Sequence, residues 1–257
     1  MTNSSVIHIL GIIPARYAST RFPGKPLALI GNKPVIQWVY ERSSDALDEV
    51  FVATDDERIF NCVRDFGGQV VMTSKNHQSG TDRCAEALEI VESMKGKHFN
   101  IVVNIQGDEP FIDPGQIKQL VDLFSDPSTE IATLVTEINC HEDLLDPNKP
   151  KVIVDTHDFA LLFSRAAIPY VQGADVKKWH LRYRFLKHIG IYAFLPDVLR
   201  KITVLPPSGL ELAESLEQLR WLENGYRIKV GTTTIENIGI DTPEDLENAR
   251  KVSRNLH

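Results

Sequence analysis

The sequence predicts an α/β protein with a mainly parallel mixed sheet flanked by helices. Short β-rich runs alternate with segments of helical periodicity through the first half of the chain. Those runs are continuously apolar, which is typical of strands covered on both faces. Polar motifs follow directly after several of the predicted strands. Because ligands bind at the carboxyl ends of the strands in such sheets, we expect the functional site along that edge.

The elements of the first half follow one another in strict alternation. Strands are expected at Val6–Ile13, Glu49–Ala53, Gln69–Met72 and Phe99–Ile105. Helices are expected at Val35–Ser43, Glu57–Phe66, Asp82–Glu92 and Pro114–Phe124. The opening apolar run is far too short to span a bilayer and has no basic segment before it. We therefore interpret it as a core strand rather than a signal peptide, and expect a cytoplasmic protein without membrane insertion.

The second half is less regular. Strands are expected at Val152–Val154, Ala160–Ser164, Ile189–Leu195, Ile228–Val230 and Ile235–Ile240, and one helix at Leu212–Glu223. The polar and aromatic segment Tyr170–Arg184 has little periodicity and is expected to form an exposed arm or a lid. A final helix is expected to start at Thr242, which is a good N-cap, with Pro243 at the first helical position and Asp245 completing a capping-box-like start.

Composition limits the function. The chain has 257 residues, of which 42% are hydrophobic and 25% charged, and a formal net charge of −7. Those values are ordinary for a globular protein, and the acidic balance disfavours nucleic-acid binding. An acidic protein that binds an anionic substrate must cluster its cations locally. Three scattered cysteines without a CxxC pair predict buried thiols in a reducing compartment, namely Cys62, Cys84 and Cys140.

A basic loop follows the first predicted strand. Within Pro14–Leu27, the cations Arg16, Arg21 and Lys25 lie in a stretch shaped by proline and glycine. Fixed cations of this kind stabilise the charge of a triphosphate and of its leaving oxygens. The loop is not a Walker A motif, because Ser19 stands where the first glycine belongs and Pro26 follows Lys25. The alternative is a solvated basic loop without a ligand. The position of the loop at the carboxyl end of a strand disfavours this alternative.

A second polar segment opens the helix expected at Asp82–Glu92. Gly80 permits close backbone approach, while Ser79 and Arg83 can donate hydrogen bonds to a bound base. The alternative interpretation is a plain helix N-cap. Both interpretations are compatible, because a capping turn also presents backbone amides. His77 is expected to be structural or to face solvent.

Two carboxylates are candidate metal ligands. Asp108 follows the buried strand at Phe99–Ile105, and Asp241 follows the strand expected at Ile235–Ile240. Mg²⁺ typically takes one or two protein carboxylates and completes its shell with water and phosphate oxygens. A turn aspartate before proline and a helix cap are the alternatives. Since Thr242 already supplies the cap, the side chain of Asp241 is free to point elsewhere.

The second half offers weaker signals. Arg165 ends a predicted strand and suits a substrate carboxylate, and His188 and Tyr192 share one face of a predicted strand because they are an even number of residues apart. Glu217 lies between core leucines. Without further information, each of these side chains is more often structural than functional.

The motifs together resemble a known family. Ile13–Arg16 with Arg21–Leu27 is similar to the N-terminal signature of sugar nucleotidyltransferases. Over essentially the whole chain, the set of motifs, including FSR at 163–165, HxGxY at 188–192 and LEQLR at 216–220, resembles the CMP-Kdo synthetase family of 3-deoxy-manno-octulosonate cytidylyltransferases. Departures from the family pattern lie mainly in Gly173–Arg184. The resemblance implies a Rossmann-like nucleotidyltransferase fold, CTP and the acidic sugar Kdo as substrates, Mg²⁺ dependence, a homodimer and a role in lipopolysaccharide biosynthesis.

The resemblance also implies roles for individual residues. Arg16, Arg21 and Lys25 would bind the CTP phosphates, the Ser79–Arg83 segment would recognise cytosine, and Asp108 and Asp241 would bind the metal. Contacts to Kdo would come from Gln106, Arg165, His188, Tyr192 and Glu217. One nucleotidyltransferase domain is expected over residues 1–257, with a nucleotide-binding half at 1–125, a sugar-binding and dimerisation lobe at 126–235, and a returning strand and helix at 236–257.

The expected reaction is direct in-line attack of the sugar's anomeric hydroxyl on the α-phosphorus of CTP, with release of pyrophosphate. No motif for a covalent nucleophile is present in the sequence. Two alternatives remain open: a cytidylyltransferase for 8-amino-Kdo or a sialic acid, and a non-catalytic nucleotide-binding protein.

Overall fold

The computed structural model describes residues 7–18 and 21–253, which form two compact units. The first unit combines the chain up to Lys118 with Phe194–Thr203 and the chain from Asn237 onward, and the second comprises Gln119–Ala193 and Val204–Glu236. The sequence analysis placed 126–235 in the second lobe, so the return of Phe194–Thr203 to the first unit was not anticipated. Within the described ranges, no helix has the length and apolar character needed to cross a membrane.

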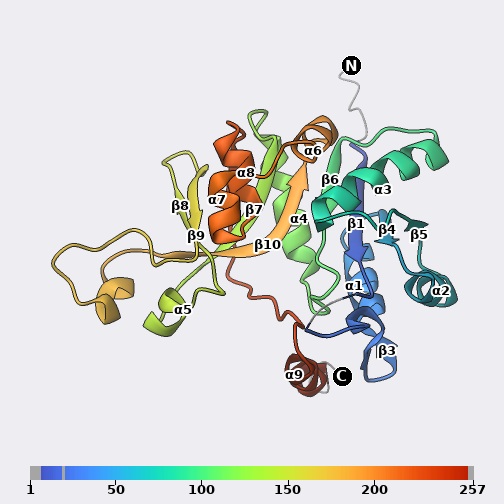
Figure 1. Ribbon diagram of the computed structural model, residues 1–257, viewed down its shortest axis with the longest axis horizontal. Helices are drawn as coiled ribbons and strands as arrows, with labels where there is room; N and C mark the ends of the chain where they lie inside the picture. Colours follow the sequence, from blue (N-terminus) through green and yellow to red (C-terminus); the bar gives the residue numbers. More distant parts are fainter. Residues whose placement is uncertain (1–6, 19–20, 254–257) are drawn as a thin grey trace. The chain divides into compact units, whose positions relative to one another are not determined.

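A parallel sheet forms the centre of the first unit (Figure 1). Its strands are β1 (Ile9–Ala15), β4 (Glu49–Thr54), β5 (Val70–Met72) and β6 (Ile101–Asn104), in the spatial order β6-β1-β4-β5. Pairing is parallel throughout, with Ala15 opposite Thr54 and Ile12 opposite Asn104. The carboxyl ends therefore share one edge. The four predicted strands are confirmed, although Val6 lies outside the described residues.

Helices complete the first unit. They are α1 (Val35–Ser44), α2 (Glu57–Asp65), α3 (Gly80–Lys95), α6 (Pro196–Ile202) and α9 (Pro243–Ser253), while α4 (Pro114–Asp122) continues into the second unit. Helix α3 packs against β1 and α6. A capping box of Ser79 and Asp82 starts α3, and Gly96 ends it in the left-handed conformation, with φ of 61°. The predicted capping box of Thr242 and Asp245 is confirmed at α9.

Short elements shape the loop after β1. The 3₁₀ turn η1 (Lys25–Leu27) follows Gly24 and leads into the hairpin of β2 (Leu29–Ile30) and β3 (Lys33–Pro34). The hairpin packs beside α9, where Ile30, Val35, Ile240 and Leu246 form a small buried cluster. This cluster brings the end of the chain next to the loop after β1.

The second unit contains β7 (Ile131–Glu137), β8 (Lys151–Val154), β9 (Ala160–Ser164), β10 (Leu186–Phe194, its last residue in the first unit) and β11 (Ile228–Thr232). The order is β11-β7-β10, and β8 pairs with β10 and β9. Short helical segments connect the strands: η2 (Leu123–Ser125), α5 (His141–Leu145), η3 (Val176–Leu181), α7 (Gly209–Glu214) and α8 (Gln218–Glu223).

Two expectations about this half were wrong, and one strand was missed. The helix expected at Leu212–Glu223 is two helices, because Ser215 adopts the left-handed conformation with φ of 51° between them. The strand expected at Ile235–Ile240 is irregular loop, in which Ile235 and Ile238 are exposed and the Asn237 side chain donates to Glu109. Strand β7 was not predicted at all. The strand expected at Ile189–Leu195 corresponds to β10, with its ends predicted to within about three residues.

The segment Tyr170–Arg184 is partly anchored rather than wholly exposed. Trp179, in η3, is 6% exposed and packs with Ile138, Leu144 and Phe185 in a second apolar cluster. Tyr170 and Leu181 remain largely exposed. The three cysteines are unpaired, as expected, but only Cys84 is fully buried.

Candidate active site

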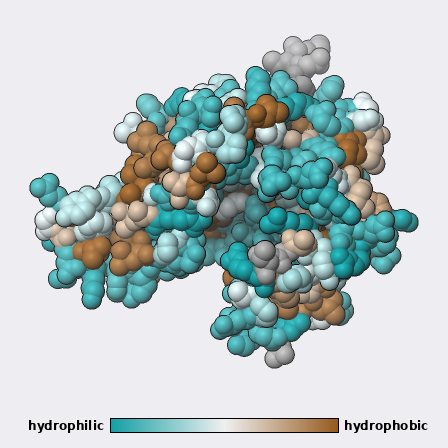
Figure 2. Space-filling model, viewed as in Figure 1, coloured by the Kyte–Doolittle hydropathy of each residue, from teal (hydrophilic) through white to brown (hydrophobic). Residues whose placement is uncertain are grey.

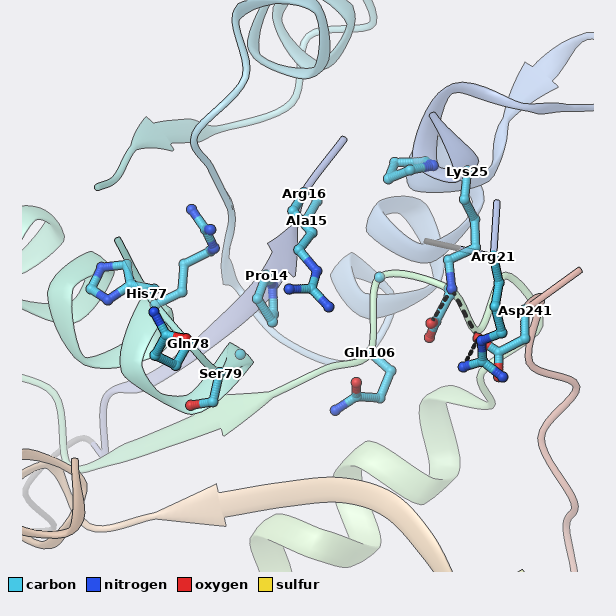
Figure 3. A pocket seen from close by; sticks show the side chains of 15 residues that line it. Pro14, Ala15, Arg16, Arg21, Lys25, His77, Gln78, Ser79, Gln106 and Asp241 are labelled. Atoms are coloured by element: carbon cyan, nitrogen blue, oxygen red, sulfur yellow. Dashed lines mark hydrogen bonds and ion pairs between the residues drawn. The ribbon is translucent and has the colours of Figure 1, made fainter. Parts of the chain in front are cut away.

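A pocket of about 360 Å³ opens in the first unit at the carboxyl ends of β1 and β6 (Figure 3). Three separate loops and the start of α3 meet there, which confirms the expectation that the polar motifs share one edge of the sheet. The predicted residues that line it are Arg16, Arg21, Lys25, Ser79, Gly80, Arg83, Gln106, Asp108 and Asp241. Arg21, Lys25 and Asp241 lie at one end of the pocket, His77, Gln78 and Ser79 lie at the other, and Arg16 lies between them.

The basic loop owes its shape to Gly24. This residue has φ of 73°, and its N–H donates to the Tyr17 carbonyl at 2.9 Å. A left-handed residue here turns the chain into η1, and glycine adopts that conformation without strain. Lys25 then leaves the turn toward the pocket, with only 12% of its side chain exposed. Ser19 and Thr20, within the predicted motif, lie outside the described residues.

Lys25 joins the two predicted metal ligands. Its Nζ donates to Asp108 Oδ2 at 2.6 Å and to Asp241 Oδ1 at 3.3 Å, and the Arg21 guanidinium contacts the same Asp241 oxygen at 3.1 Å. Figure 3 shows the two bonds from Lys25 as dashed lines. Two of the three predicted phosphate-binding cations therefore contact the predicted metal ligands, which come from distant parts of the chain.

Asp241 reaches this place from a loop rather than from a strand. The Ile240 N–H donates to the Asp108 carbonyl at 2.9 Å, which fixes the loop against the end of β6. The Asp245 carboxylate accepts the backbone N–H groups of both Asp241 and Thr242. Because Asp245 and Thr242 cap α9, the Asp241 side chain is left to face Lys25.

The two carboxylates suit a divalent cation. Within the described ranges there is no group of three or more His, Cys, Asp or Glu residues suited to a metal, but Mg²⁺ needs only one or two carboxylates when phosphate oxygens and water supply the rest. The Lys25 ammonium already lies between Asp108 and Asp241. A positive charge is thus favourable at this position, and the donor set fits Mg²⁺.

Glu109 is a neighbour of this site that the sequence analysis left aside. Burial, and then the charge of Asp108, raise the pKa of Glu109 to about 7, although Asn237 donates a hydrogen bond to its carboxylate at 2.6 Å. The sequence carried no signal for this pair, because Asn237 was assigned to a strand. The pair ties the loop before Asp241 to the residue after Asp108.

Gly107 separates Gln106 from Asp108 at a point of close packing. A Cβ at Gly107 would lie 2.8 Å from the Pro14 carbonyl oxygen. The absence of a side chain at this position allows the loop after β6 to approach the end of β1. Such backbone contact cannot be relieved by a side-chain movement.

The segment at the start of α3 combines capping with access to the pocket. Ser79 accepts from the Asp82 N–H at 3.1 Å, so the N-cap interpretation is confirmed. Arg83 is 3% exposed and donates to Thr73 Oγ1, the Ser74 carbonyl and Asp55 Oδ2. Its guanidinium therefore holds the preceding loop in place beside the pocket. His77 contacts Glu86, in agreement with a structural role.

Four predicted sugar-binding residues belong to the second unit, whereas Gln106 belongs to the first. The rings of His188 and Tyr192 lie 5.2 Å apart, which confirms that they share one face of β10. Tyr192 also packs on Trp221, at 5.1 Å. Burial, and then the charge of Glu217, raise the pKa of Tyr192 well above its usual range. Glu217 lies immediately before α8.

The Arg165 guanidinium donates hydrogen bonds to backbone carbonyl groups, two of them at the break between α7 and α8. Its Nε donates to the Glu214 carbonyl at 2.6 Å, Nη2 to the Ser215 carbonyl at 3.3 Å, and Nη1 to the Pro147 carbonyl at 2.9 Å. The Glu214 carboxylate in turn accepts from the Arg165 N–H at 2.9 Å. These contacts hold the turn that precedes Glu217.

Lys151 is a buried cation that the sequence analysis missed. It is 0% exposed, and its ammonium donates to the Asp146 carbonyl at 2.9 Å. Burial lowers the pKa of Lys151, and the charge of nearby Arg165 lowers it further, while Asp146 and Glu214 oppose this shift. A lysine inside a short apolar strand gives no sequence signal of its environment.

His188 provides a test of stability against pH. Burial lowers its pKa to about 3, and its Nε2 lies 2.9 Å from Thr133 Oγ1. The folded state therefore favours neutral imidazole, and this contribution is complete above an unfolded pKa of about 6.5. As pH falls below that value, the unfolded chain takes up a proton that the folded chain refuses. We expect the free energy of unfolding to fall by about 2 kcal/mol between pH 6.5 and 5.0 from this group alone.

The measurement is urea unfolding of wild type and His188→Gln at pH 7.5 and 5.0. The variant should show the smaller loss of stability on acidification. His98→Gln serves as the matched control, because the His98 side chain is 91% exposed. An identical pH dependence in wild type and His188→Gln would contradict the prediction.

Comparison with known proteins gives consistent matches over the length of the chain. The family model described as cytidylyltransferase matches residues 10–238. A 3-deoxy-manno-octulosonate cytidylyltransferase of Parabacteroides distasonis is 57% identical over 95% of this chain and 97% of its own length. The enzyme of the same name from Thermodesulfovibrio yellowstonii is 51% identical over 93% of this chain and 96% of its own length.

A solved structure agrees with these sequence matches. The structure of CMP:2-keto-3-deoxy-manno-octonic acid synthetase complexed with CTP superposes with a TM-score of 0.87 at 42% identity, covering 97% of this chain and 100% of the other. The similarity thus includes both units.

Proposed function

The chain belongs to the cytidylyltransferase family, with the 3-deoxy-manno-octulosonate cytidylyltransferases among its members, and from that premise we propose that it transfers CMP from CTP to Kdo and releases pyrophosphate. The observation that carries the proposal is the meeting of Lys25 and Arg21 with Asp108 and Asp241 in one pocket. Such an arrangement of cations and carboxylates is suited to a metal-bound triphosphate. In the same proposal, the reaction occurs in the cytoplasm as the activation of Kdo for lipopolysaccharide biosynthesis.

The pocket residues divide into two groups in this mechanism. Arg16, Arg21 and Lys25 bind and orient the phosphates, so that the leaving pyrophosphate is stabilised as its charge develops. Asp108 and Asp241 would hold Mg²⁺, which would supply positive charge to the phosphate oxygens and lower the pKa of the attacking hydroxyl. Lys25 changes partners in this scheme: it neutralises the two carboxylates before the metal binds, and the phosphates afterwards.

The cytosine end of CTP is assigned to the start of α3. Ser79 and Gly80 line the pocket there, and the capping turn exposes backbone groups that can hydrogen-bond to a base edge. The buried Arg83 keeps the loop at Thr73 and Ser74 in place through the hydrogen bonds described above. We therefore propose that Arg83 maintains the shape of the site that binds the base.

The sugar acid is assigned to four side chains of the second unit, namely Arg165, His188, Tyr192 and Glu217, while Gln106 lines the pocket of the first unit. His188 is neutral at physiological pH because of its burial, so it can accept or donate a hydrogen bond without repelling a cation or attracting an anion. Glu217 and Tyr192 offer further polar groups. We propose that this set recognises the hydroxyl groups of Kdo.

Arg165 gives a test of the sugar site. We expect Arg165→Ala to raise the KM for Kdo about 10- to 100-fold, because the turn before Glu217 loses its anchor. The KM for CTP should stay within about twofold of wild type. Steady-state kinetics with each substrate varied in turn measures both values, and an unchanged sugar KM would count against any role of Arg165 in the sugar site.

Arg165→Lys separates two ways in which this residue can act. Lysine keeps the positive charge but cannot bridge three carbonyl groups with a planar fork. If Arg165 positions the turn at Ser215, lysine should fail to restore the sugar KM. Restoration by lysine would instead assign Arg165 to direct charge pairing with the sugar carboxylate.

The proposal as a whole is tested by incubating the protein with CTP, Mg²⁺ and one acid at a time, and measuring pyrophosphate. Kdo should give the fastest release, with 8-amino-Kdo and a sialic acid as the comparison substrates. A faster rate with either comparison acid would assign the chain to that substrate. Tight CTP binding without pyrophosphate from any acid would favour the non-catalytic alternative.

A homodimer is also part of the proposal, and the second unit supports it. Large apolar side chains are exposed there, among them Leu161, Tyr170, Leu181 and Leu212, at 61–75% exposure. Figure 2 shows apolar surface on the segment between β9 and β10. Exposed apolar groups of this kind are typical of an interface with a second protein surface. Light scattering of the purified protein measures the mass directly.

A further inference from the structure

The ring of Tyr17 is held between a guanidinium and a glycine backbone. The Arg58 guanidinium carbon lies 3.3 Å from the centroid of the Tyr17 ring. A Cβ on Gly24 would come within 3.0 Å of three atoms of the same side chain. The Tyr17 carbonyl also accepts the Gly24 N–H, at 2.9 Å. Tyr17 thus packs directly against the turn that precedes Lys25.

Arg58 is itself fixed in orientation. The Asp56 carboxylate accepts from Arg58 Nε at 2.9 Å and from Nη2 at 2.7 Å, and it caps α2 by accepting the Arg58 N–H at 3.0 Å. A two-point contact of this kind defines the plane of the guanidinium as well as its position. The start of α2 therefore presents a rigid, flat cation to the Tyr17 ring.

This stack connects two neighbouring loops of the sheet edge. Tyr17 follows β1, and Asp56 follows β4, whose end pairs with the end of β1 at Ala15 and Thr54. Gly24 has φ of 73°, and the residue after it is Lys25, whose Nζ reaches Asp108 at 2.6 Å. The Tyr17 ring therefore packs against the residue that immediately precedes Lys25.

Neither Tyr17 nor Arg58 is among the described residues that line the pocket. Two of the Arg58 donor atoms are already bound to Asp56, and 58% of its side chain is exposed. An exposed stack of this kind contributes little to global stability. Its effect is expected in the placement of the loop, since small displacements of binding groups strongly reduce rates.

We propose that Tyr17 and Arg58 are positioning residues for the phosphate-binding loop, and that their stack sets the place of Lys25 against the triphosphate. The inference rests on the proposed cytidylyl transfer. Asp56 is a third positioning residue, because it orients Arg58. None of the three residues binds a ligand itself, and they act only through the turn at Gly24.

The experiment compares Tyr17→Leu, Tyr17→Phe and Arg58→Met with wild type in the pyrophosphate assay. Tyr17→Leu and Arg58→Met should each lower kcat/KM for CTP about 10-fold or more, with the KM for Kdo unchanged. Tyr17→Phe should retain wild-type kinetics, because the ring rather than the hydroxyl makes the stack. The double variant Tyr17→Leu/Arg58→Met should lose little more than either single variant, since both remove the same contact.

Lys97→Met is the matched control. Lys97 lies 5.0 Å from the ring of Phe99 and pairs with Glu49, so its replacement also removes a surface cation over an aromatic ring, but far from the pocket. Its kinetics should match wild type. Thermal unfolding should place all of these variants within a few degrees of wild type.

Three results would overturn the inference. Tyr17→Leu could keep the wild-type kcat/KM for CTP, or Tyr17→Phe could be as impaired as Tyr17→Leu. The third is an equal loss of kcat/KM for CTP and for Kdo together with a large fall in Tm. Calorimetric titration with CTP tests the inference independently of the proposed function. If wild type binds CTP but releases no pyrophosphate, the proposed function is wrong. The inference is then tested by CTP affinity alone, and equal affinity in wild type and Tyr17→Leu would overturn it.

Discussion

Asp108→Asn is expected to lower kcat by at least about 10³-fold, because it removes one of two carboxylates that would hold the metal against the phosphates. Asparagine has the same shape, and the backbone bond from Ile240 to the Asp108 carbonyl does not depend on the side chain. The carboxylate is 34% exposed, so its loss leaves no buried cavity. The variant should therefore fold, while its pyrophosphate release falls by that factor.

Two further measurements make this result specific. Titration with Mn²⁺, followed by its paramagnetic signal, should show weaker binding in Asp108→Asn than in wild type. Asp65→Asn, at an exposed position in α2, supplies the control for loss of one negative charge. Substantial turnover by a folded Asp108→Asn protein would refute the assignment of Asp108 as a metal ligand.

Much of the first unit could be predicted because its signals are local. Each of its strands is a short, mostly apolar run, and glycine, proline or charged residues follow it in the next loop. Parallel pairing then places those loops at one edge without any further information. The meeting of Lys25 with Asp108 follows from this rule alone.

The position of Asp241 was predicted correctly for a partly wrong reason. The strand expected before it is a loop, and the loop is placed by two long-range contacts, from Ile240 to Asp108 and from Asn237 to Glu109. Contacts between residues more than a hundred positions apart leave no mark on local periodicity. The correct part was the capping argument, in which Thr242 and Asp245 satisfy the helix and free Asp241.

The second unit was harder to predict because its features depend on tertiary contacts. Strand β7 carries two threonines among apolar residues, and the fold buries Thr133, whose hydroxyl donates to the Ile191 carbonyl at 2.8 Å. The break between α7 and α8 depends on Ser215 in a conformation that serine rarely adopts. Arg165, Glu214 and Ser164 stabilise that break, and only the folded structure brings them together.

The roles of the individual cations in the site could not be predicted from the sequence either. Sequence shows Arg83 and Lys25 as equivalent positive charges beside polar motifs. The structure shows that Arg83 is buried and bound to Asp55, whereas Lys25 faces the pocket between two acids. The difference depends on which partners fold around each residue, so a basic motif predicts a site but not the role of each cation.

Lys25→Met should produce opposite effects on metal binding and on catalysis. In wild type the ammonium lies between Asp108 and Asp241, at 2.6 and 3.3 Å, and so competes with a divalent cation for both carboxylates. Methionine has similar length without the charge. We expect Mn²⁺ binding in the absence of nucleotide to tighten about tenfold, since the two carboxylates lose their neutralising partner.

Turnover should nevertheless fall about 10²- to 10³-fold, because the same side chain stabilises the phosphates during transfer. Titration with Mn²⁺ and the pyrophosphate assay on one preparation measure both effects, and Lys33→Met, whose ammonium pairs with Glu41, controls for the loss of a surface cation. A residue that only stabilised the loop would weaken metal binding and activity together. Parallel losses would therefore contradict the exchange of partners by Lys25, whereas opposite changes follow only if its ammonium occupies the place that the metal takes.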